Sequence, residues 1–195
     1  MQSADVTGVI LCGGRGSRVG GRDKGLIPVA GRPLIEHVLE RVQPQVERVI
    51  INANRSLDAY RAYGLPVIPD LGPGFLGPLA GILASMDDCR TPWLFCAPCD
   101  APEIPRNLVA RLHDTATAQG AEICCVHDGR RLQPVFCLYS VATRGSLNEY
   151  LESGERKIDR FFLRHRFATL ELPGNDGAFL NLNSPEDVQE YEGGR

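Results

Sequence analysis

The chain is 195 residues long, 43% of them hydrophobic and 23% charged, and its formal net charge is −3. This length and composition predict a single globular domain over residues 1–195 with enough apolar side chains for a substantial core. A weakly acidic chain argues against a nucleic-acid-binding domain, which is normally basic. No run of the sequence approaches the ~20 apolar residues of a membrane-spanning helix. We therefore expect neither nucleic acid nor a membrane among its partners.

The cysteines indicate a reducing environment. Seven are present, an odd number, and most lie in apolar runs, which is typical of reduced thiols in the core of a cytoplasmic protein. Cys96 and Cys99 form a C-x-x-C pair, a spacing that elsewhere marks a redox dithiol or half of a zinc site. The sequence has no second pair and no histidine at ligand spacing, so we favour two core thiols at a strand end.

The most informative stretch starts with the apolar run 9–12, which predicts a buried strand. A loop with five glycines and four basic side chains follows: Gly13, Gly14, Gly16, Gly20, Gly21, Arg15, Arg18, Arg22 and Lys24. Glycines let backbone N–H groups approach an anion, and the cations neutralise it, so the pattern predicts a phosphate-binding loop. Val19 replaces the third glycine of a dinucleotide fingerprint, and Asp23 replaces the glycine that precedes a P-loop lysine.

The elements after this loop alternate as in an α/β protein. Pro33 opens a helix that ends at Pro44. We then expect strand 47–53, helix 56–62, strand 65–69, helix 78–88, a central strand 93–97, helix 105–118, a hairpin of strands 121–126 and 133–138, helices 141–152 and from 155, and an edge strand 167–172. Residues 180–183 predict a last strand with Asn181 and Asn183 on one side. Ser184 and Pro185 begin the C-terminal helix. This order predicts a single-domain, Rossmann-like three-layer sandwich, mostly parallel with one antiparallel strand.

Polar side chains follow three of the predicted strands. Asn52 and Asn54 end strand 47–53, Asp70 follows strand 65–69, and Asp100 follows the central strand. Ligands of open α/β sheets bind outside the carboxyl ends of the strands, so these groups are candidates for binding. Asp100 stands between prolines that hold the chain extended, and a carboxylate is a suitable Mg²⁺ ligand. For Asn54 we favour a turn-forming role.

The loop L-C-G-G-R-G-S-R-V-G-G-R-D-K resembles the nucleotidyltransferase signature L-A-G-G-x-x-x-R-M-G-x-x-K. The short spacer before Lys24, together with Asn52, Asp70 and the ending N-L-N-S-P-E, is similar in particular to the molybdenum cofactor guanylyltransferases. The resemblance extends from residue 8 to about 190. It implies a fold like that of the nucleotide-diphospho-sugar transferases. Cys12 stands where this family usually has alanine.

The resemblance implies transfer of GMP from GTP to the terminal phosphate of the molybdenum cofactor (Mo-molybdopterin), with release of pyrophosphate. Mg²⁺ would bind Asp100, and Arg18 and Lys24 would stabilise the triphosphate and the leaving pyrophosphate. Transient contacts with molybdenum-inserting proteins and molybdoenzymes are implied as well. The nucleotide-binding residues carried over are Leu11, Cys12, Gly13, Gly14, Lys24, Asn52, Asp70, Gly77, Gly81 and Asp100. Those for the acceptor are Arg156, Asn181 and Asn183.

Three other functions are open at this stage. Two are other nucleotidyl transfers. One uses another nucleotide, namely cytidylyl transfer to molybdopterin, and the other uses another acceptor, a sugar 1-phosphate, although sugar enzymes are mostly longer. The third is a nucleotide-binding partner of a molybdoenzyme without transfer activity. Lys24 and Asp100 argue against the third, because binding alone does not require a metal-bound carboxylate. For Arg156 and for the glycines Gly77 and Gly81, a solvated surface and simple helix packing are the alternatives.

Overall fold

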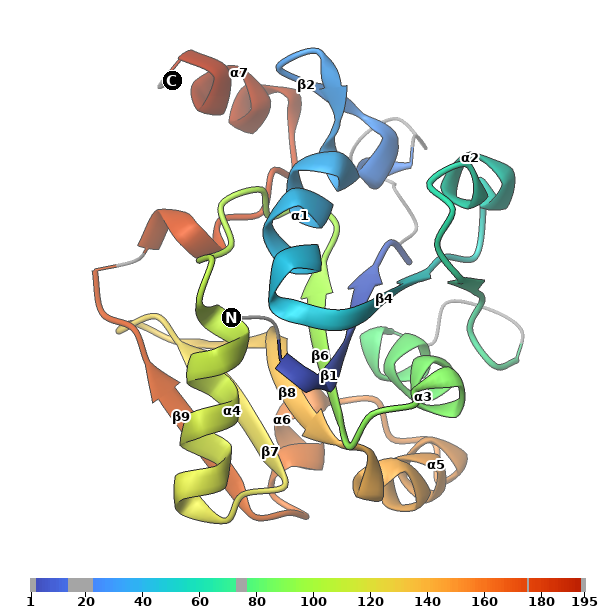
Figure 1. The fold of residues 1–195 in the computed structure, drawn as a ribbon, viewed down its shortest axis with the longest axis vertical. Coiled ribbons are helices and arrows are strands. Elements are labelled where there is room, and N and C mark those ends of the chain that lie inside the picture. The colour runs from blue at the N-terminus through green and yellow to red at the C-terminus, as the bar shows by residue number, and fades with distance from the viewer. Residues whose placement is uncertain (1–2, 14–22, 73–76, 175, 194–195) are drawn as a thin grey trace.

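The computed structural model describes residues 3–13, 23–72, 77–174 and 176–193 (Figure 1). Its centre is a seven-stranded sheet in the order β5-β4-β1-β6-β8-β7-β9. The strands are β1 (Ser3–Leu11), β4 (Val46–Asn52), β5 (Val67–Ile68), β6 (Trp93–Pro98), β7 (Ile123–His127), β8 (Leu132–Ser140) and β9 (Phe167–Glu171). As the sequence predicts, β6 is the middle strand and β9 an edge.

One strand gives the sheet its mixed character. β8 runs antiparallel to both neighbours, β6 and β7. β1 is parallel to β4 and β6, β4 to β5, and β7 to β9. The carboxyl ends of β1, β4 and β6 therefore meet at one edge of the sheet, which is where open α/β sheets bind ligands.

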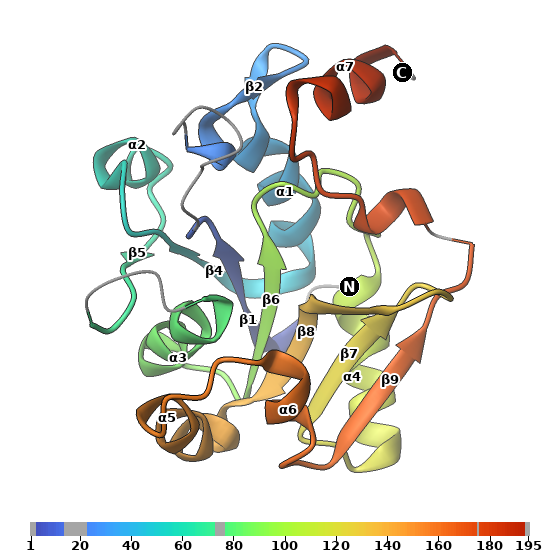
Figure 2. The same ribbon diagram turned by 180° about the vertical axis from the view of Figure 1, so that it is seen from behind.

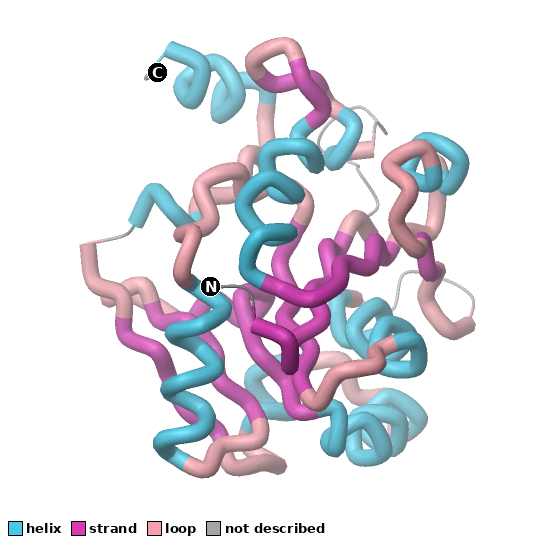
Figure 3. The backbone as a smooth tube through the Cα atoms, in the orientation of Figure 1, coloured by secondary structure: helices cyan, strands magenta, loops and turns pink. Residues whose placement is uncertain are grey.

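Helices cover both faces of the sheet (Figures 1 and 2). On one face lie α1 (Leu34–Val42) and α4 (Leu108–Gln119); on the other lie α3 (Pro78–Asp88), α5 (Arg144–Glu152) and α6 (Ile158–Phe162). A large apolar cluster fills each interface between sheet and helices. Figure 3 shows the strands enclosed between the helices. The predicted three-layer α/β sandwich is confirmed.

The C-x-x-C pair is part of these two cores. Cys96 belongs to the cluster under α3, α5 and α6, whereas Cys99 belongs to the cluster under α1 and α4. Side chains three residues apart on an extended chain point to opposite faces, so the two thiols do not face each other. All seven cysteines are free, and six of them are buried.

A smaller part of the molecule lies beyond the carboxyl ends of the strands. A 3-10 helix (Lys24–Leu26) leads into a hairpin of β2 (Pro28–Val29) and β3 (Arg32–Pro33), and α2 (Leu57–Arg61) follows β4. The C-terminal helix α7 (Pro185–Gly193) lies beside this hairpin in both views. A small apolar cluster of Val29, Leu34 and Leu182 joins α7 to the rest.

Two expectations from the sequence are corrected. Residues 180–183 form no strand. The alternation of leucine and asparagine is not matched by alternating burial, because Leu180 is 57% exposed and Leu182 only 3%. The Leu182 N–H donates to the carbonyl oxygen of Asp100 (2.8 Å), which ties this segment to the loop after β6. Helix α4 begins at Leu108 instead of Pro105, since the Leu108 N–H closes a turn onto the Pro105 carbonyl.

No helix in the described part of the chain is both long and apolar enough to span a membrane.

Candidate active site

The ends of three adjacent strands bring the predicted site together. Leu11 at the end of β1 pairs with Asn52 of β4 on one side and with Pro98 of β6 on the other. Beyond the ladder, the Cys12 N–H donates to the Asn52 carbonyl (2.8 Å) and the Cys99 N–H to the Leu11 carbonyl (3.1 Å). The parallel register therefore places the start of the glycine-rich loop between Asn52 and Asp100.

Lys24 and Asp100 form the centre of this edge. The Nζ atom of Lys24 lies 3.2 Å from Oδ2 of Asp100 and 2.5 Å from Oδ1 of Asn183. The three residues come from the start of the 3-10 helix, the loop after β6 and the segment before α7. Two residues predicted for catalysis thus contact each other, and one predicted for the acceptor contacts the same lysine.

The electrostatics of Asp100 suit a metal or phosphate site. Asp100 is only 6% exposed, and this burial raises the pKa of its carboxyl group. The charge of Lys24 and the hydrogen bond that it donates lower the pKa and so oppose the rise. Its Oδ1 atom is buried and accepts no hydrogen bond from the described residues. A buried carboxylate oxygen without a donor is normally satisfied by a partner such as a cation.

A divalent ion fits this donor set. Among the described residues, no group of three or more His, Cys, Asp or Glu side chains is arranged to hold a metal. Mg²⁺ needs no such cage, because it binds through one or two carboxylates and completes its shell with water and substrate phosphates. Asp100, with its free Oδ1, provides the protein ligand of that arrangement.

Asn52, Asn54 and Asp70 form what we call the nucleotide cluster. Asn52 Nδ2 donates to Asp70 Oδ1 (3.0 Å), and Asn54 Nδ2 donates to Asp70 Oδ2 (2.8 Å). Asn54 Oδ1 also accepts from the Asp70 N–H (2.8 Å). Asn54, for which the sequence favours a turn, therefore holds Asp70 at both its carboxylate and its backbone. The sequence signal for this role of Asn54 was its position two residues after Asn52.

Of three predicted glycines near the nucleotide cluster, Gly81 makes room for it. A Cβ atom on Gly81 would lie 2.2 Å from Oδ1 of Asn52, closer than any real contact. A Cβ on Gly13 would lie 3.6 Å from both Asn52 Oδ1 and Asn54 Nδ2, an ordinary contact. Gly77, at the start of α3, has a φ of +82°, a conformation that favours glycine. Gly81 is thus required for the approach of α3 to Asn52.

Asp23, the residue before Lys24, is anchored in the interior. Asp23 is 9% exposed. Its Oδ1 accepts from the Tyr60 hydroxyl of α2 (2.5 Å), and its Oδ2 lies 3.5 Å from Nε of Arg55. A Cβ on Gly25 would lie 2.6 Å from that hydroxyl. Tyr60 and Asp23, which the sequence analysis does not single out, hold the chain on both sides of Lys24.

Cys12 packs into the same interior. Hydrogen bonding with Cys12, together with burial, raises the pKa of the Cys99 thiol. Burial, followed by the neighbouring Cys12 and Cys99, raises the pKa of Tyr60. The side chain of Cys12 is therefore buried behind the site, and its backbone N–H makes the strand contact described above.

Asn183 is positioned by the start of α7. The carboxylate of Asp187 accepts from the N–H groups of Asn183 (2.7 Å) and Ser184 (2.9 Å), and the Ser184 hydroxyl accepts from the Asp187 N–H (3.1 Å). This reciprocal arrangement is a capping box. Hydrogen bonding to the Asn183 N–H is the largest effect and lowers the pKa of Asp187; burial opposes it, and the hydrogen bonds with Ser184 lower the pKa further. The predicted cap at Ser184 is confirmed.

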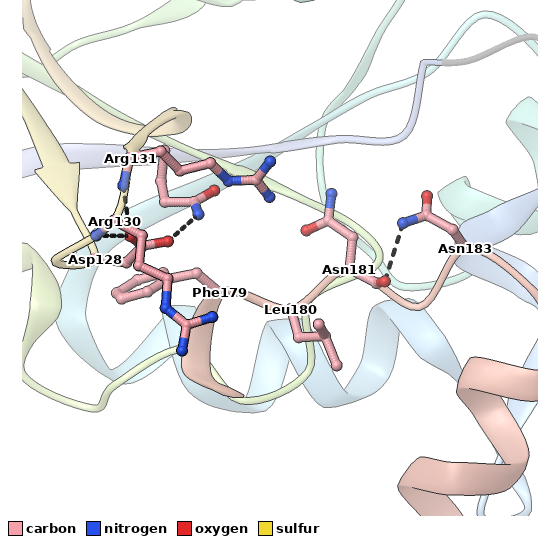
Figure 4. A pocket seen from close by; sticks show the side chains of 8 residues that line it. Asp128, Arg130, Arg131, Phe179, Leu180, Asn181 and Asn183 are labelled. Atoms are coloured by element: carbon pink, nitrogen blue, oxygen red, sulfur yellow. Dashed lines mark hydrogen bonds between the residues drawn. The ribbon is translucent and has the colours of Figure 1, made fainter. Parts of the chain in front are cut away.

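Beside Asn183 lies a cavity of about 430 Å³, which we call the acceptor pocket (Figure 4). The β7–β8 hairpin and the segment before α7 form its walls. Its lining residues are Asp128, Arg130, Arg131, Gln133, Phe179, Leu180, Asn181 and Asn183. Asn181 and Asn183 thus share one pocket even though they form no strand. The two arginines were missed because a hairpin tip by itself predicts only a solvated turn.

One predicted site residue, Arg156, lies away from these groups, and two are not described. Arg156 is exposed in the loop between α5 and α6, where its Nη1 donates to the carbonyls of Leu151 (2.7 Å) and Glu155 (2.6 Å). Neither hydrogen bond involves Asn181 or Asn183, the other two residues predicted for the acceptor. Gly14 and Arg18 lie outside the described residues.

The comparisons with known proteins agree with this geometry. Residues 8–169 match the model of the MobA-like NTP transferase domain. A molybdenum cofactor guanylyltransferase of Cupriavidus taiwanensis is 49% identical over 193 residues, which is 96% of each chain. One from Shewanella halifaxensis is 44% identical over 188 residues, 96% of this chain and 94% of that one. The chain belongs to the molybdenum cofactor guanylyltransferase family. It is therefore a nucleotidyltransferase.

Solved structures support the same fold. Molybdopterin-guanine dinucleotide biosynthesis protein A from Archaeoglobus fulgidus superposes with a TM-score of 0.80 at 22% identity, over 96% of this chain and 97% of that one. A CMP:2-keto-3-deoxy-manno-octonic acid synthetase complexed with CTP superposes with a TM-score of 0.73 at 13% identity, over 98% of each chain. The sandwich is thus shared by a protein of guanine dinucleotide biosynthesis and by a synthetase complexed with CTP, so the fold alone does not select the base.

Proposed function

We propose that this chain transfers GMP from GTP to the terminal phosphate of the molybdenum cofactor, forming molybdopterin guanine dinucleotide and releasing pyrophosphate. The observation that carries the proposal is the contact of Lys24 with both Asp100 and Asn183. It joins a buried carboxylate at the nucleotide edge to the amide that lines the acceptor pocket. The full-length relatives named above favour GTP over the cytidylyl and sugar alternatives.

The reaction needs no covalent intermediate on the protein. An oxygen of the acceptor phosphate attacks the α-phosphorus of GTP, and the bond from that phosphorus to the pyrophosphate oxygen breaks. Lys24 neutralises charge on the phosphates, and Asn183 fixes the direction of its ammonium group. The N–H groups of the glycine-rich loop and Arg18 serve the triphosphate in this proposal. Catalysis is then positioning and electrostatic stabilisation of an in-line displacement.

Mg²⁺ is the ion we propose for Asp100. When bound, it supplies Lewis-acid stabilisation of the charge that develops on the phosphate oxygens. Oδ1 of Asp100 is the ligand, because Oδ2 already pairs with Lys24. In this proposal Lys24 contacts phosphate directly, and the carboxylate of Asp100 holds the ion.

Selection of guanine is assigned to Asp70. Guanine presents N1–H and N2–H₂ donors, which a carboxylate accepts, whereas cytosine lacks the same donor pair. Each oxygen of Asp70 accepts one hydrogen bond from an asparagine amide, which leaves further acceptor capacity on both. Gly77 and Gly81 at the start of α3 border the nucleoside in this proposal, and Arg156 remains a proposed acceptor residue.

The nature of the product suggests protein partners, and the free cysteines suggest the cellular compartment. A finished cofactor must be passed on, so transient contacts with molybdenum-inserting proteins and with receiving molybdoenzymes belong to the proposal. Seven free thiols suit the reducing cytoplasm.

The test is a transfer assay with GTP, CTP and ATP, each with Mg²⁺ and molybdenum-loaded molybdopterin. Mass spectrometry identifies the dinucleotide, and a coupled assay measures pyrophosphate. We expect the guanine dinucleotide and one pyrophosphate for each turnover with GTP. A preference for CTP, or binding of GTP without transfer, would refute the proposal. Asp70→Asn should lower the GTP-to-CTP ratio of kcat/KM, whereas Asp58→Asn on the exposed surface of α2 should not.

A further inference from the structure

The acceptor pocket contains cationic groups that the proposed reaction does not use. Lys24 and Asp100 account for the attacking phosphate, yet the pocket also presents Arg130 and Arg131 from the tip of the β7–β8 hairpin. Both arginines are exposed. A guanidinium group in a cavity favours an anionic ligand, because it presents charged hydrogen-bond donors in a planar fork.

Asp128 fixes the backbone of the hairpin tip. Its Oδ1 accepts from the backbone N–H groups of Arg130 (2.8 Å) and Arg131 (2.9 Å), and its Oδ2 accepts from Gln133 Nε2 (2.6 Å). The carboxylate therefore binds the backbone of the tip and leaves the side chains directed outward. Within the described parts of the chain, the Arg131 guanidinium donates no hydrogen bond.

The side chain of Arg131 extends across the pocket toward Asn181, as Figure 4 shows. Oδ1 of Asn181 is itself buried and accepts no hydrogen bond from the described residues. On the same side, Leu180 is 57% exposed and Phe179 lies behind it. The pocket thus combines a cationic wall, an unused acceptor and an apolar surface. A flat heterocycle with N–H donors and a separate negative group matches these three features.

The pocket is continuous with the reaction centre through Asn183. This residue lines the pocket, and its Oδ1 accepts from Lys24, which in turn contacts Asp100. An acceptor whose phosphate reaches Lys24 must place the rest of its length toward Asn181 and the hairpin. In the molybdenum cofactor that remainder is a pterin that carries the metal on a dithiolene, and the oxo-metal dithiolene group is anionic.

The geometry points to Arg131 as a second anion site that binds the oxo-metal dithiolene part of the acceptor and so distinguishes metal-loaded from metal-free acceptor. This inference rests on the proposed function and deepens it. The phosphate end is common to both forms of the acceptor. A residue that distinguishes the two forms must therefore lie outside the Lys24–Asp100 site, and Arg131 is a cation of the pocket in that position.

The experiment measures KM for GTP and for each form of the acceptor with wild type and Arg131→Ala. We expect KM for the metal-loaded acceptor to rise about tenfold, as for loss of a charge-assisted hydrogen bond, with a smaller rise for the metal-free acceptor and none for GTP. Arg131→Lys should recover part of the affinity, because it keeps the charge but not the planar fork. Arg111→Ala, an exposed arginine of α4, is the matched control and should change none of the three values.

Each outcome decides the inference. An unchanged KM for loaded acceptor, or equal rises for the loaded and metal-free forms, would overturn it. A rise in KM for GTP would place Arg131 on the nucleotide side and overturn it as well. Failure of the proposed function gives a different result, because wild type would then form no dinucleotide. Equilibrium binding of the two acceptor forms to wild type and Arg131→Ala would still test the arginine site in that case.

Discussion

The two sides of the active site are built in different ways. On the nucleotide side, most polar groups satisfy one another: Asp70 binds Asn52 and Asn54, and Oδ2 of Asp100 pairs with Lys24. The exception there is Oδ1 of Asp100, which we assign to an ion. In the acceptor pocket, the Arg131 guanidinium and Asn181 Oδ1 have no hydrogen-bond partner among the described residues. The first side is therefore largely preorganised around one free oxygen, whereas the second presents both an unused donor and an unused acceptor.

This difference follows from the supporting elements. The nucleotide side stands on the ends of parallel strands that are hydrogen-bonded to each other. The acceptor pocket joins a hairpin tip to a segment without regular structure, and the capping box of α7 holds that segment. Strand ends fix positions closely, whereas loops adapt to a ligand of greater length. We infer that the nucleotide side sets the chemistry and the pocket sets the choice of acceptor.

The largest effect is expected at Lys24. Lys24→Ala removes the cation that contacts both Asp100 and Asn183. We expect kcat of guanylyl transfer to fall by about a hundredfold or more, as when a donor to transition-state charge is lost. Steady-state kinetics measure this. Lys157→Ala, at an exposed lysine, is the matched control. Equal kcat values for the two variants would remove Lys24 from the chemistry.

Gly81→Ala should act on GTP alone. The new Cβ would lie 2.2 Å from Asn52 Oδ1, so Asn52 must move and release Asp70. We expect about a tenfold loss of GTP affinity, the equivalent of one good hydrogen bond, with KM for the acceptor unchanged. Calorimetry of GTP binding measures it. Gly145→Ala, where a Cβ meets nothing within 4 Å, should bind GTP normally. Equal affinities would contradict the role given to the nucleotide cluster.

Tyr60→Phe should reduce stability more than chemistry. It removes the hydroxyl donor to Asp23 and leaves a buried carboxylate oxygen without that hydrogen bond. The expected loss is about 1–2 kcal/mol in the free energy of unfolding, measured with urea. kcat should fall only a few-fold, because Lys24 keeps its own contacts. Tyr63→Phe, whose hydroxyl makes a longer bond to Glu36 (3.3 Å), should be nearly neutral. No difference between the variants would refute the anchoring role.

The smallest effect concerns the pH response of the hairpin tip. Hydrogen bonds from the backbone of Arg131, from Gln133 and from the backbone of Arg130 lower the pKa of Asp128 to about 2. A carboxyl with a lowered pKa stabilises the folded tip above the unfolded value of ~3.9. That stabilisation is lost as pH falls through about 2. NMR titration of the carboxyl carbon checks this, and a midpoint near 4 would contradict the structure. Asp128→Asn should loosen the tip at neutral pH.

The sequence predicts the nucleotide side far better than the acceptor pocket. Asn52, Asp70 and Asp100 each follow an apolar strand, and parallel strands bring such residues to one edge, so a local pattern is sufficient. Gly81 was a candidate from its motif, and the structure adds the reason: the side chain of Asn52 fills its Cβ position.

The pocket depends on contacts that no local pattern contains. Arg131 and Asn181 line one pocket only because the antiparallel strand β8 brings the hairpin tip beside the chain before α7. Residues 180–183 predict a strand by alternation, but their backbone is tied to Asp100 and to α7 instead of to the sheet. Tyr60 was not recognised because a buried tyrosine normally indicates only core packing, and its partner Asp23 is a neighbour only in the fold.

The decisive measurement for the metal site is the effect of Mg²⁺ on GTP binding to wild type and to Asp100→Asn. We assign the ion to Oδ1 of Asp100, a buried oxygen that accepts no hydrogen bond from the described residues. Calorimetry should show that Mg²⁺ tightens GTP binding to wild type and has little effect on the variant, while both proteins melt cooperatively. Equal tightening in the two proteins would contradict the role of Asp100 as metal ligand, because the metal site would then lie elsewhere.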